Sequence, residues 1–351
     1  MNVLVTGGAG FIGSHVCKAL AHAGFEPVVY DNLSRGHAHA VKWGPLEEGD
    51  IRDRARVLDA LRRHNIGAVM HFAALAYVGE SFAASEAYYD VNVAGTWSLL
   101  QAMHDANLDV LVYSSSCAVY GVPVSGVCTE DLPTRPINPY GASKAAGEQL
   151  LRMQALANGL RFLALRYFNA AGADPEGDLG EEHEPEPHLI PNAIRAALPG
   201  GPPLSIYGLD YPTADGSAER DYVHVSDIAD AHVAALQHLL RRGVNDVINL
   251  CAERGASILE VCRAVKDVLG AAPRTIVSPR RPGDPPRLVG NGEKAAKLLG
   301  WRPQRSDLRE MISDAARWIC AVERPHQWGT GMGNLAPPSH DRAQPMPDRP
   351  V

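Results

Sequence analysis

The fold is decided near the start of the chain, where residues 3–13 read Val3-Leu4-Val5-Thr6-Gly7-Gly8-Ala9-Gly10-Phe11-Ile12-Gly13. A short apolar run, typical of a buried strand, is followed at once by glycines and then by a helical pattern. Gly7, Gly10 and Gly13 allow a tight turn, a close approach of the backbone to a pyrophosphate, and close packing of helix on strand. Because the free N–H groups at a helix start attract phosphate oxygens, the stretch predicts a dinucleotide-binding turn.

Asp31 ends the next apolar run and supplies the acidic residue that such a turn requires. A carboxylate there accepts hydrogen bonds from the ribose hydroxyls and repels a 2′-phosphate, so it predicts NAD rather than NADP. Arg35 lies close by and favours the opposite choice. Asp50 and Ile51 suit an adenine pocket, with helix capping by Asp53 as the alternative use of this segment.

Apolar runs alternate with helical patterns through the first half of the chain. The expected strands cover residues 3–5, 27–30, 68–72, 110–113 and 160–165, and the expected helices cover 12–23, 53–65, 85–106 and 139–158. This alternation predicts an α/β fold of the Rossmann type, a doubly wound parallel sheet with helices on both faces. We expect residues 1–171 to form the NAD-binding Rossmann domain. Residues 172–324 then form a smaller C-terminal α/β substrate domain that can lend elements back to the main sheet, and 325–351 form a disordered proline-rich tail.

Composition argues against several other classes of function. The 351 residues carry a formal net charge of −7, which is unfavourable for binding nucleic acids or anionic membrane surfaces. No secretory signal is visible, and no apolar run approaches the ~20 residues of a membrane span. The six cysteines are scattered without paired spacing, as in the reduced proteins of the cytoplasm. We therefore expect a cytoplasmic protein with neither a nucleic-acid nor a membrane partner.

A candidate catalytic pair, Tyr140 and Lys144, follows Pro139. The proline suits a first helical turn, which places the pair one turn apart on the same helix face. A phenol with its usual pKa near ~10 is a poor base at neutral pH, and a nearby ammonium group favours the phenolate. A positively charged nicotinamide ring acts in the same direction. The pair therefore predicts proton abstraction by Tyr140, helped by Lys144.

A third catalytic candidate is Ser116, which lies at the carboxyl end of an expected strand. Ligands of open α/β sheets bind at that edge, where a hydroxyl can share the substrate proton with Tyr140. Ser114 and Ser115 are alternatives for the functional hydroxyl, and turns at strand ends favour serine in any case.

Taken together, these motifs resemble the extended short-chain dehydrogenase/reductase family and, within it, the UDP-glucose 4-epimerases. The segments that carry the closer resemblance are His71-Phe72-Ala73-Ala74-Leu75, Val78-Gly79-Glu80-Ser81, Tyr88-Tyr89-Asp90 with Asn92, Arg166-Tyr167-Phe168-Asn169 and Arg220-Asp221-Tyr222-Val223-His224-Val225. The resemblance implies an isomerase that interconverts UDP-glucose and UDP-galactose with tightly held NAD. Tyr140 takes the proton of the sugar 4-hydroxyl while hydride leaves C4, the 4-ketose turns over, and hydride returns to its opposite face.

The resemblance also implies which residues bind the two ligands. Around NAD it places Gly7, Gly10, Phe11, Ile12, Gly13, Asp31, Asn32, Asp50, Ile51, Phe72, Ala73, Ala74, Asn92, Tyr140, Lys144 and Phe168. Around the UDP-sugar it places Ser116, Asn169, Leu189, Arg220, Arg281, Asp284 and Leu288. The arginines suit a diphosphate because a guanidinium group can bind phosphate oxygens in pairs, whereas a surface salt bridge is the alternative for either arginine alone.

Helices 85–106 and 139–158 are implied as the interface of a homodimer. The first of them carries a stripe of large side chains, Tyr88, Tyr89, Val93, Trp97 and Leu100, which can equally pack in a core.

Two positions depart from the family pattern. Ala76 stands where many members carry a lysine near the cofactor phosphates, and Leu288 stands where a tyrosine closes the sugar pocket in well-known bacterial members. A smaller group at position 288 suits UDP-N-acetylhexosamines, or a pocket reshaped for UDP-xylose and UDP-arabinose. The sequence thus leaves the preferred sugar open.

Two rival functions remain. A 4,6-dehydratase requires an acidic pair directly after the catalytic hydroxyl, where this chain has Cys117 and Ala118. A non-catalytic NAD-sensing regulator can share the fold, but it has no need of Ser116, Tyr140 and Lys144 together.

One segment of the expected loop has the chemistry of a metal site. It reads Glu182-His183-Glu184-Pro185-Glu186-Pro187-His188, and imidazole and carboxylate groups suit metal ions. Its prolines break any regular spacing, which predicts that these side chains share no face. We therefore expect a solvated loop without a metal site, and surface positions for His37 and His39.

Overall fold

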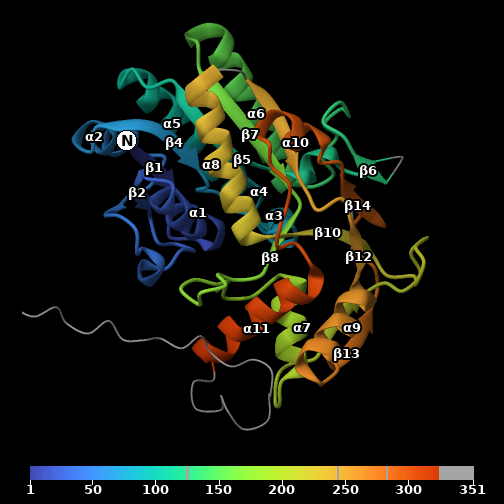
Figure 1. The fold of residues 1–351 in the computed structure, drawn as a ribbon. Coiled ribbons are helices and arrows are strands. Elements are labelled where there is room, and N and C mark those ends of the chain that lie inside the picture. Colours follow the sequence, from blue (N-terminus) through green and yellow to red (C-terminus); the bar gives the residue numbers. More distant parts are fainter. Residues whose placement is uncertain (124–125, 243–244, 282–283, 324–351) are drawn as a thin grey trace, which may run out of the picture.

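The computed structural model describes residues 1–123, 126–242, 245–281 and 284–323, which form a large α/β part and a smaller, mainly helical part beneath it (Figure 1). The tail predicted over residues 325–351 lies outside the described residues. Among the helices of the described ranges, none combines the length and the apolar composition that crossing a membrane requires.

Seven strands form the main sheet, in the order β11-β7-β5-β4-β1-β2-β3, and every neighbouring pair is parallel. The bounds are β1 (Asn2–Thr6), β2 (Glu26–Asp31), β3 (Leu46–Glu48), β4 (Ile66–His71), β5 (Val110–Ser116), β7 (Arg161–Tyr167) and β11 (Asp246–Leu250). The order runs outward in both directions from β1 and β4, which confirms the predicted Rossmann sheet. Because ligands of such sheets bind where the order reverses, the carboxyl ends of β1 and β4 mark the ligand edge.

Helices cover both faces of this sheet because alternate strand residues point to opposite sides. One face lies under α1 (Phe11–His22) and α8 (Val225–Arg242), and its core includes Val3 and Val5. The other face lies under α2 (Arg54–Arg63), α5 (Gly95–Asp105) and α6 (Pro139–Asn158), and its core includes Leu4 and Leu111. Both faces of the sheet are therefore buried, as the continuous apolar runs of its strands predict.

The smaller part is built around three helices, α7 (Leu189–Ala197), α9 (Ile258–Leu269) and α11 (Leu308–Glu323), which share one apolar core. Short strands complete it and connect it to the main sheet: β6 (Val127–Cys128), β8 (Asn169–Ala171), β9 (Leu204–Tyr207), β10 (Glu219–His224), β12 (Gly255–Ser257), β13 (Thr275–Ser278) and β14 (Arg287–Gly290). The start of α9 is fixed by a capping box, in which Ser257 and Glu260 each bind the other's backbone N–H.

The two halves of the sequence interleave in space. The strand β11 and the helix α8 come from the C-terminal half, yet they form the edge of the main sheet and one of its covers (Figure 1). The division of the chain at residues 171 and 324 is a sequence boundary within this interleaved arrangement, and it stays a proposal.

The segment predicted as one helix over residues 85–106 has a more detailed structure. It consists of α4 (Ser85–Tyr89), a π-helical turn η2 (Asp90–Ala94) and then α5. A π turn inserts an extra residue into the helix and is frequent at functional sites. Here it contains Asn92, whose side chain is buried. The remaining short helices are η1 (Ala38–Ala40), α3 (Val78–Ala83), η3 (Cys117–Tyr120) and α10 (Glu293–Leu299).

Candidate active site

The glycine turn is a backbone cradle with no room for side chains. A Cβ on Gly7, whose φ is +70°, would lie 2.5 Å from the backbone nitrogen of Ala73, and a Cβ on Gly13 would lie 2.2 Å from the Gly7 carbonyl oxygen. Both distances are shorter than any real Cβ contact, so the sequence must keep glycine here. Gly10 caps α1 without a side-chain hydrogen bond, and the first turn of that helix contains no acidic residue. This arrangement fits the diphosphate of a dinucleotide, since it leaves helix N–H groups free for phosphate.

Asp31 joins this cradle to the end of β2. Its carboxylate is 7% exposed and accepts hydrogen bonds from the backbone N–H groups of Ala9, at 3.0 Å, and Leu33, at 2.9 Å. Burial raises the pKa of Asp31, although both hydrogen bonds act against this. Arg35, the residue that favoured NADP, is engaged elsewhere: its guanidinium pairs with Glu80 at 2.9 Å and lies over the Tyr77 ring. The local contacts therefore favour the NAD interpretation.

The predicted adenine segment divides into an exposed and a buried half. Asp50 accepts hydrogen bonds from Asn32, at 3.1 Å, and from Arg52, which lowers the pKa of its carboxyl to about 2. Ile51 is 4% exposed and packs in the core under α5. Asp53 accepts a hydrogen bond from the N–H of Arg56 and caps α2, which is the alternative use of this segment.

The loop after β4 is fixed beside the glycine cradle. The N–H groups of Phe72 and Ala73 both donate to the carbonyl of Thr6, which holds the start of the loop against β1, and Ala74 follows them. Further along, the Asn92 side chain accepts from the N–H of Leu75 and donates to its carbonyl. Asn92 thereby connects the cofactor loop to the helices over the sheet.

The same asparagine reaches the catalytic helix. Its amide donates to the Ser143 hydroxyl on α6 at 2.9 Å.

Phe168, another predicted NAD residue, is buried at the end of β7. Phe11 and Ile12 begin α1 and are half-buried. The structure thus brings the predicted cofactor residues to one edge of the sheet, with the Ile51 side chain turned into the core.

The three serines of β5 have different partners. Ser114 hydrogen-bonds to Tyr167, and Ser115 donates to Glu148 at 2.6 Å. Ser116 accepts from the N–H of Ala118 at 3.2 Å, and its hydroxyl lies beside the phenol of Tyr140, where it acts to lower the pKa of that phenol. Among the three candidate hydroxyls, Ser116 is therefore the one placed to share a proton with Tyr140.

Lys144 lies one turn after Tyr140 on α6, and both side chains are buried. It is 3% exposed, and its ammonium group donates to the Ser114 carbonyl at 2.8 Å. Burial lowers the pKa of Lys144 to about 7. Burial also raises the pKa of Tyr140 to about 12, and the neighbouring Ser116 hydroxyl acts against this rise. The role of Lys144 in favouring the phenolate of Tyr140 stays a prediction, and burial is the largest influence on the pKa of each group in this structure.

The predicted sugar-nucleotide residues gather around β10. Its Arg220 pairs in register with Leu288 on β14, and its Tyr222 pairs with Asn169 on β8. The Arg220 guanidinium contacts the Asp284 carboxylate. Leu288 is 7% exposed and belongs to the main core. One short strand therefore brings four of the predicted substrate residues together.

Arg281 and Leu189 complete the predicted set. The Arg281 guanidinium is exposed and stacks on the Tyr207 ring with its central carbon 3.9 Å from the ring centroid. Leu189 is the first residue of α7 and is half-buried.

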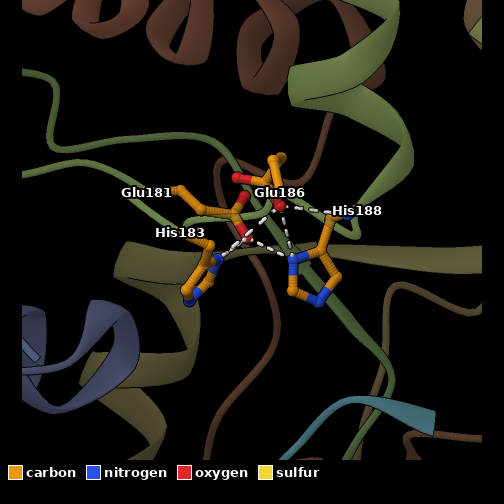
Figure 2. Close-up of side chains that lie close together, drawn as sticks. All are labelled: Glu181, His183, Glu186 and His188. Carbon is orange, nitrogen blue, oxygen red and sulfur yellow. Dashed lines mark hydrogen bonds and ion pairs between the residues drawn. The ribbon is translucent and has the colours of Figure 1, made fainter. Parts of the chain in front are cut away.

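The loop before α7 departs from its prediction. Glu181, His183, Glu186 and His188 converge so that their ligand atoms all lie within 4.8 Å of one another (Figure 2). The side chains of Glu181 and Glu186 are only 5% and 3% exposed. The prediction of a solvated loop whose side chains share no face is therefore wrong. Spacing rules apply to helices and strands, whereas this loop folds back on itself at residues 184–185. His37 is half-buried and His39 is exposed.

Sequence reasoning missed two supports of this site. Tyr88 was interpreted as one residue of an apolar stripe, yet its hydroxyl accepts from the N–H of Tyr77 and donates to its carbonyl, while its ring lies 6.4 Å from that of Tyr140. Glu148 forms a buried ion pair with Arg166 and also accepts from Ser115. The spacing of Glu148, one turn after Lys144 on the same helix, was the signal that could have found it.

These features define a dinucleotide-dependent enzyme of the short-chain dehydrogenase/reductase type, with a tyrosine, a lysine and a serine at the ligand edge of its sheet. The model of the NAD dependent epimerase/dehydratase family matches residues 3–251, and the chain belongs to this family.

Known relatives match over nearly the full length of both proteins. A UDP-glucose 4-epimerase of Rhizobium meliloti is 50% identical over 317 residues, covering 90% of this chain and 96% of the relative. The crystal structure of a UDP-glucose 4-epimerase from Brucella ovis in complex with NAD superposes with a TM-score of 0.88 at 50% identity, covering 90% of this chain and 97% of that one. The UDP-glucose 4-epimerase of Bifidobacterium longum, solved with NAD+ and UDP, has a TM-score of 0.87 at 36% identity, covering 92% and 99%.

Proposed function

We propose that this protein interconverts UDP-glucose and UDP-galactose by 4-epimerisation, with NAD held tightly and not consumed. The observation that carries the proposal is the placement of the Ser116 hydroxyl beside the buried Tyr140 phenol, at the ligand edge of a dinucleotide-binding sheet. The relatives that match this chain over nine tenths of its length are UDP-glucose 4-epimerases, and solved members were found with NAD or UDP.

The glycine turn, Asp31 and the loop after β4 would hold NAD at this edge. The fit to NAD rests on the backbone cradle at Gly7 and Gly13. Because neither residue has a side chain, a diphosphate can come close to the backbone there. When bound, NAD supplies a reversible acceptor for the hydride of C4.

Tyr140 would take the proton of the sugar 4-hydroxyl. Its pKa of about 12 in the protein alone is too high for a base at neutral pH, so positive charge must be brought close when the site is loaded. Ser116 can pass the proton between the sugar hydroxyl and the phenol. The same residues return the proton after the 4-ketose has turned over, which accounts for a reaction without net oxidation.

Arg220 and Arg281 would bind the diphosphate of the UDP-sugar. Arg220 is held beside Asp284, and that pairing aligns a guanidinium group that can also bind phosphate oxygens. Arg281 stacks on the Tyr207 ring and is exposed, so that an anion can reach its guanidinium group.

A second candidate substrate is a UDP-sugar of another size. Leu288 lies next to Arg220 in the paired strands, at the place where the family pattern has a tyrosine. The shorter side chain favours UDP-N-acetylhexosamine, with UDP-xylose and UDP-arabinose as further candidates.

The function is tested by incubating the purified protein separately with UDP-galactose, UDP-GalNAc and UDP-xylose, without added NAD. We expect the 4-epimer of UDP-galactose to appear, and the ratio of the three rates gives the sugar preference. If no 4-epimer forms from any of the three, the enzymatic assignment fails and the NAD-sensing regulator becomes the better hypothesis.

We also propose a homodimer built from α4, α5 and α6. Their outer faces expose Tyr89 (46%), Trp97 (40%), Met153 (46%) and Leu156 (82%), a set of large apolar groups that a second copy can cover. Light scattering during gel filtration should give a dimer, and Leu156→Glu should give a monomer. The cytoplasm is the proposed compartment, because the six cysteines are scattered without paired spacing and five of them are buried.

A further inference from the structure

The loop before α7 contains a group of four side chains that the proposed reaction does not use. It consists of Glu181, His183, Glu186 and His188, called here the four-ligand cluster (Figure 2). The Nδ1 atom of His183 lies 3.2 Å from Glu181 Oε1 and 3.6 Å from Glu186 Oε1. The Nδ1 atom of His188 lies 2.5 Å and 3.1 Å from the same two oxygens. Each imidazole nitrogen therefore faces both carboxylates, and the four atoms surround one point.

These atoms satisfy one another only in part. Glu186 Oε1 accepts from the backbone N–H of His188 at 3.0 Å and hydrogen-bonds to the Nδ1 atom of the same residue at 3.1 Å. Glu181 Oε1, His183 Nδ1 and Glu186 Oε2 are buried and make no hydrogen bond of acceptable geometry within the described residues. A buried polar atom without a partner costs about 1–3 kcal/mol, and more when it is charged, so native proteins rarely leave several side by side. The short distances and the three unpartnered atoms are explained together if the lone pairs point at a shared centre.

A neighbouring group of acidic residues has a cation at its centre, and the four-ligand cluster has none among the described residues. Asp174, Glu176 and Asp178 surround the ammonium group of Lys18, with distances of 2.8, 2.6 and 3.0 Å from its nitrogen. In the described part of the chain, no lysine or arginine donates a hydrogen bond to the carboxylates of the four-ligand cluster. The nearest such charge is Arg195, 3.8 Å from Glu186 Oε2, and it is engaged with Glu323 at 2.6 Å.

We propose that the four-ligand cluster binds one divalent transition-metal ion, with zinc as the best match. Zinc takes imidazole nitrogen and carboxylate oxygen at about 2.0–2.2 Å in a tetrahedron, which places ligand atoms roughly 3.3 Å apart. The four imidazole–carboxylate separations of 2.5–3.6 Å bracket that value, and all the ligand atoms lie within 4.8 Å of one another. Calcium and magnesium are disfavoured, because they bind through oxygen and avoid a site that is half imidazole.

Four protein ligands leave no open position, so the site is structural. It would close the loop onto the first turn of α7, since His188 directly precedes Leu189. The ring of Tyr77 lies edge-on to both imidazoles, at 5.5 Å from His183 and 6.1 Å from His188. Tyr77 is in turn clamped through its backbone by Tyr88. The ion thus fixes the cofactor loop and α7 relative to each other.

The direct test is metal binding by the full-length protein after its affinity tag has been removed and bound metal has been stripped with a chelator. Isothermal titration with zinc should show one equivalent per chain, and saturation should raise Tm by about 5 °C. X-ray absorption at the zinc edge should show four nitrogen and oxygen ligands, including imidazole, and no sulfur. If zinc, manganese, cobalt and iron(II) all fail to bind, the proposal is overturned, and protons shared between the histidines and glutamates occupy the centre.

Matched variants locate the ion. Glu181→Gln and His183→Gln should each lose the zinc equivalent. Glu182→Gln and His39→Gln change the adjacent trio of His37, His39 and Glu182 and should retain it. The reverse pattern would place the ion in that trio and refute the four-ligand cluster. Should a cluster variant fail to fold, retention of the zinc equivalent by Glu182→Gln and His39→Gln still excludes the trio.

The expected effect of the ion on the reaction rests on the proposed function. Failure of the metal proposal can be distinguished from failure of the epimerase proposal. Removal of the ion should raise KM for UDP-galactose several-fold while kcat changes little, since the ion positions α7 and touches no reacting atom. Loss of kcat with unchanged KM would contradict the positioning role. Absence of any turnover would count against the epimerase proposal alone, because zinc stoichiometry and Tm do not depend on catalysis.

Discussion

The catalytic edge of the main sheet and the loop before α7 both bury polar side chains, but they hold them in opposite ways. At the catalytic edge, Ser116 stands on β5 and Tyr140 and Lys144 stand on α6. The Ser116 hydroxyl accepts from the N–H of Ala118, and Lys144 donates to the Ser114 carbonyl. In the loop, the atoms of Glu181 and His183 lie 3.2 Å apart without hydrogen-bond geometry.

The difference separates two kinds of functional group. Side chains on packed strands and helices are pre-organised by the core, so their own partners can be complete before any ligand arrives. Buried polar atoms that remain unsatisfied in a loop instead indicate that a further partner is needed. The catalytic edge should therefore govern the chemical step, and the loop should govern position and stability.

The largest effect is expected at the phenol. Tyr140→Phe should lower kcat by about 10³-fold, because general acid–base catalysis typically contributes 10²–10⁴. NAD released by denaturing the variant should remain stoichiometric, since the glycine turn is untouched. Tyr89→Phe changes an exposed tyrosine of α4 and serves as the control. Near wild-type turnover by Tyr140→Phe would contradict the proposal that Tyr140 abstracts the substrate proton.

The second prediction is that two serines of β5 differ in their effect on kcat and on stability. Ser116→Ala should lower kcat by about 10²-fold, because it removes the hydroxyl that shares the proton with Tyr140. Ser115→Ala removes a hydrogen bond to the buried Glu148 and should cost about 1–3 kcal/mol of stability, with a much smaller change in kcat. Equal losses of kcat in both variants would show that the serine run acts through packing. Steady-state rates and urea unfolding measure the two quantities.

The third prediction concerns the buried charge of Lys144. Its folded pKa of about 7 lies below the ordinary value of 10.5, so the unfolded chain binds more protons between these values and stability rises with pH across that window. Lys144→Met should therefore stabilise the protein by a few kcal/mol at pH 7 or below, and the gain should fade towards pH 10.

Thermal unfolding of this variant across the pH range provides the check. Lys297→Met is a suitable control, because that side chain is 76% exposed and its removal should leave the pH profile of the wild type unchanged. A Lys144→Met variant that is less stable than the wild type at pH 7 would show that the hydrogen bond to Ser114 outweighs desolvation.

The smallest effect is expected in sugar selectivity. Leu288→Tyr adds bulk next to Arg220 and should lower kcat/KM for UDP-GalNAc relative to UDP-galactose by about tenfold, the range typical of steric discrimination in a pocket. Competition between the two substrates measures the ratio. An unchanged ratio would mean that another part of the smaller helical region determines selectivity.

Much of the catalytic edge could be predicted from the sequence because its parts lie on regular elements. The glycine spacing follows from the turn between β1 and α1, and Asp31 follows from the end of β2. Tyr140 and Lys144 share a helix face because Pro139 begins α6. Periodicity reports such local geometry directly.

The choice among the serines and the direction of the Lys144 ammonium could not be predicted in this way. Both depend on which groups of β5, β7 and α6 meet in space, and on how completely water is excluded. The sequence marks Ser114, Ser115 and Ser116 as equivalent hydroxyls, whereas packing gives them separate partners in Tyr167, Glu148 and Tyr140.

The sequence alone determined the Rossmann sheet, the dinucleotide turn and the tyrosine, lysine and serine candidates, because each depends on hydrophobic periodicity or on residue types within one turn. Tertiary structure alone decided the partner of each serine, the π turn that places Asn92, and the convergence of Glu181 with His188. These features depend on burial and on contacts between distant or irregular segments, where side-chain direction follows no repeating pattern. The physical reason is that a helix or strand carries its geometry in its own backbone, while a loop takes its geometry from its surroundings.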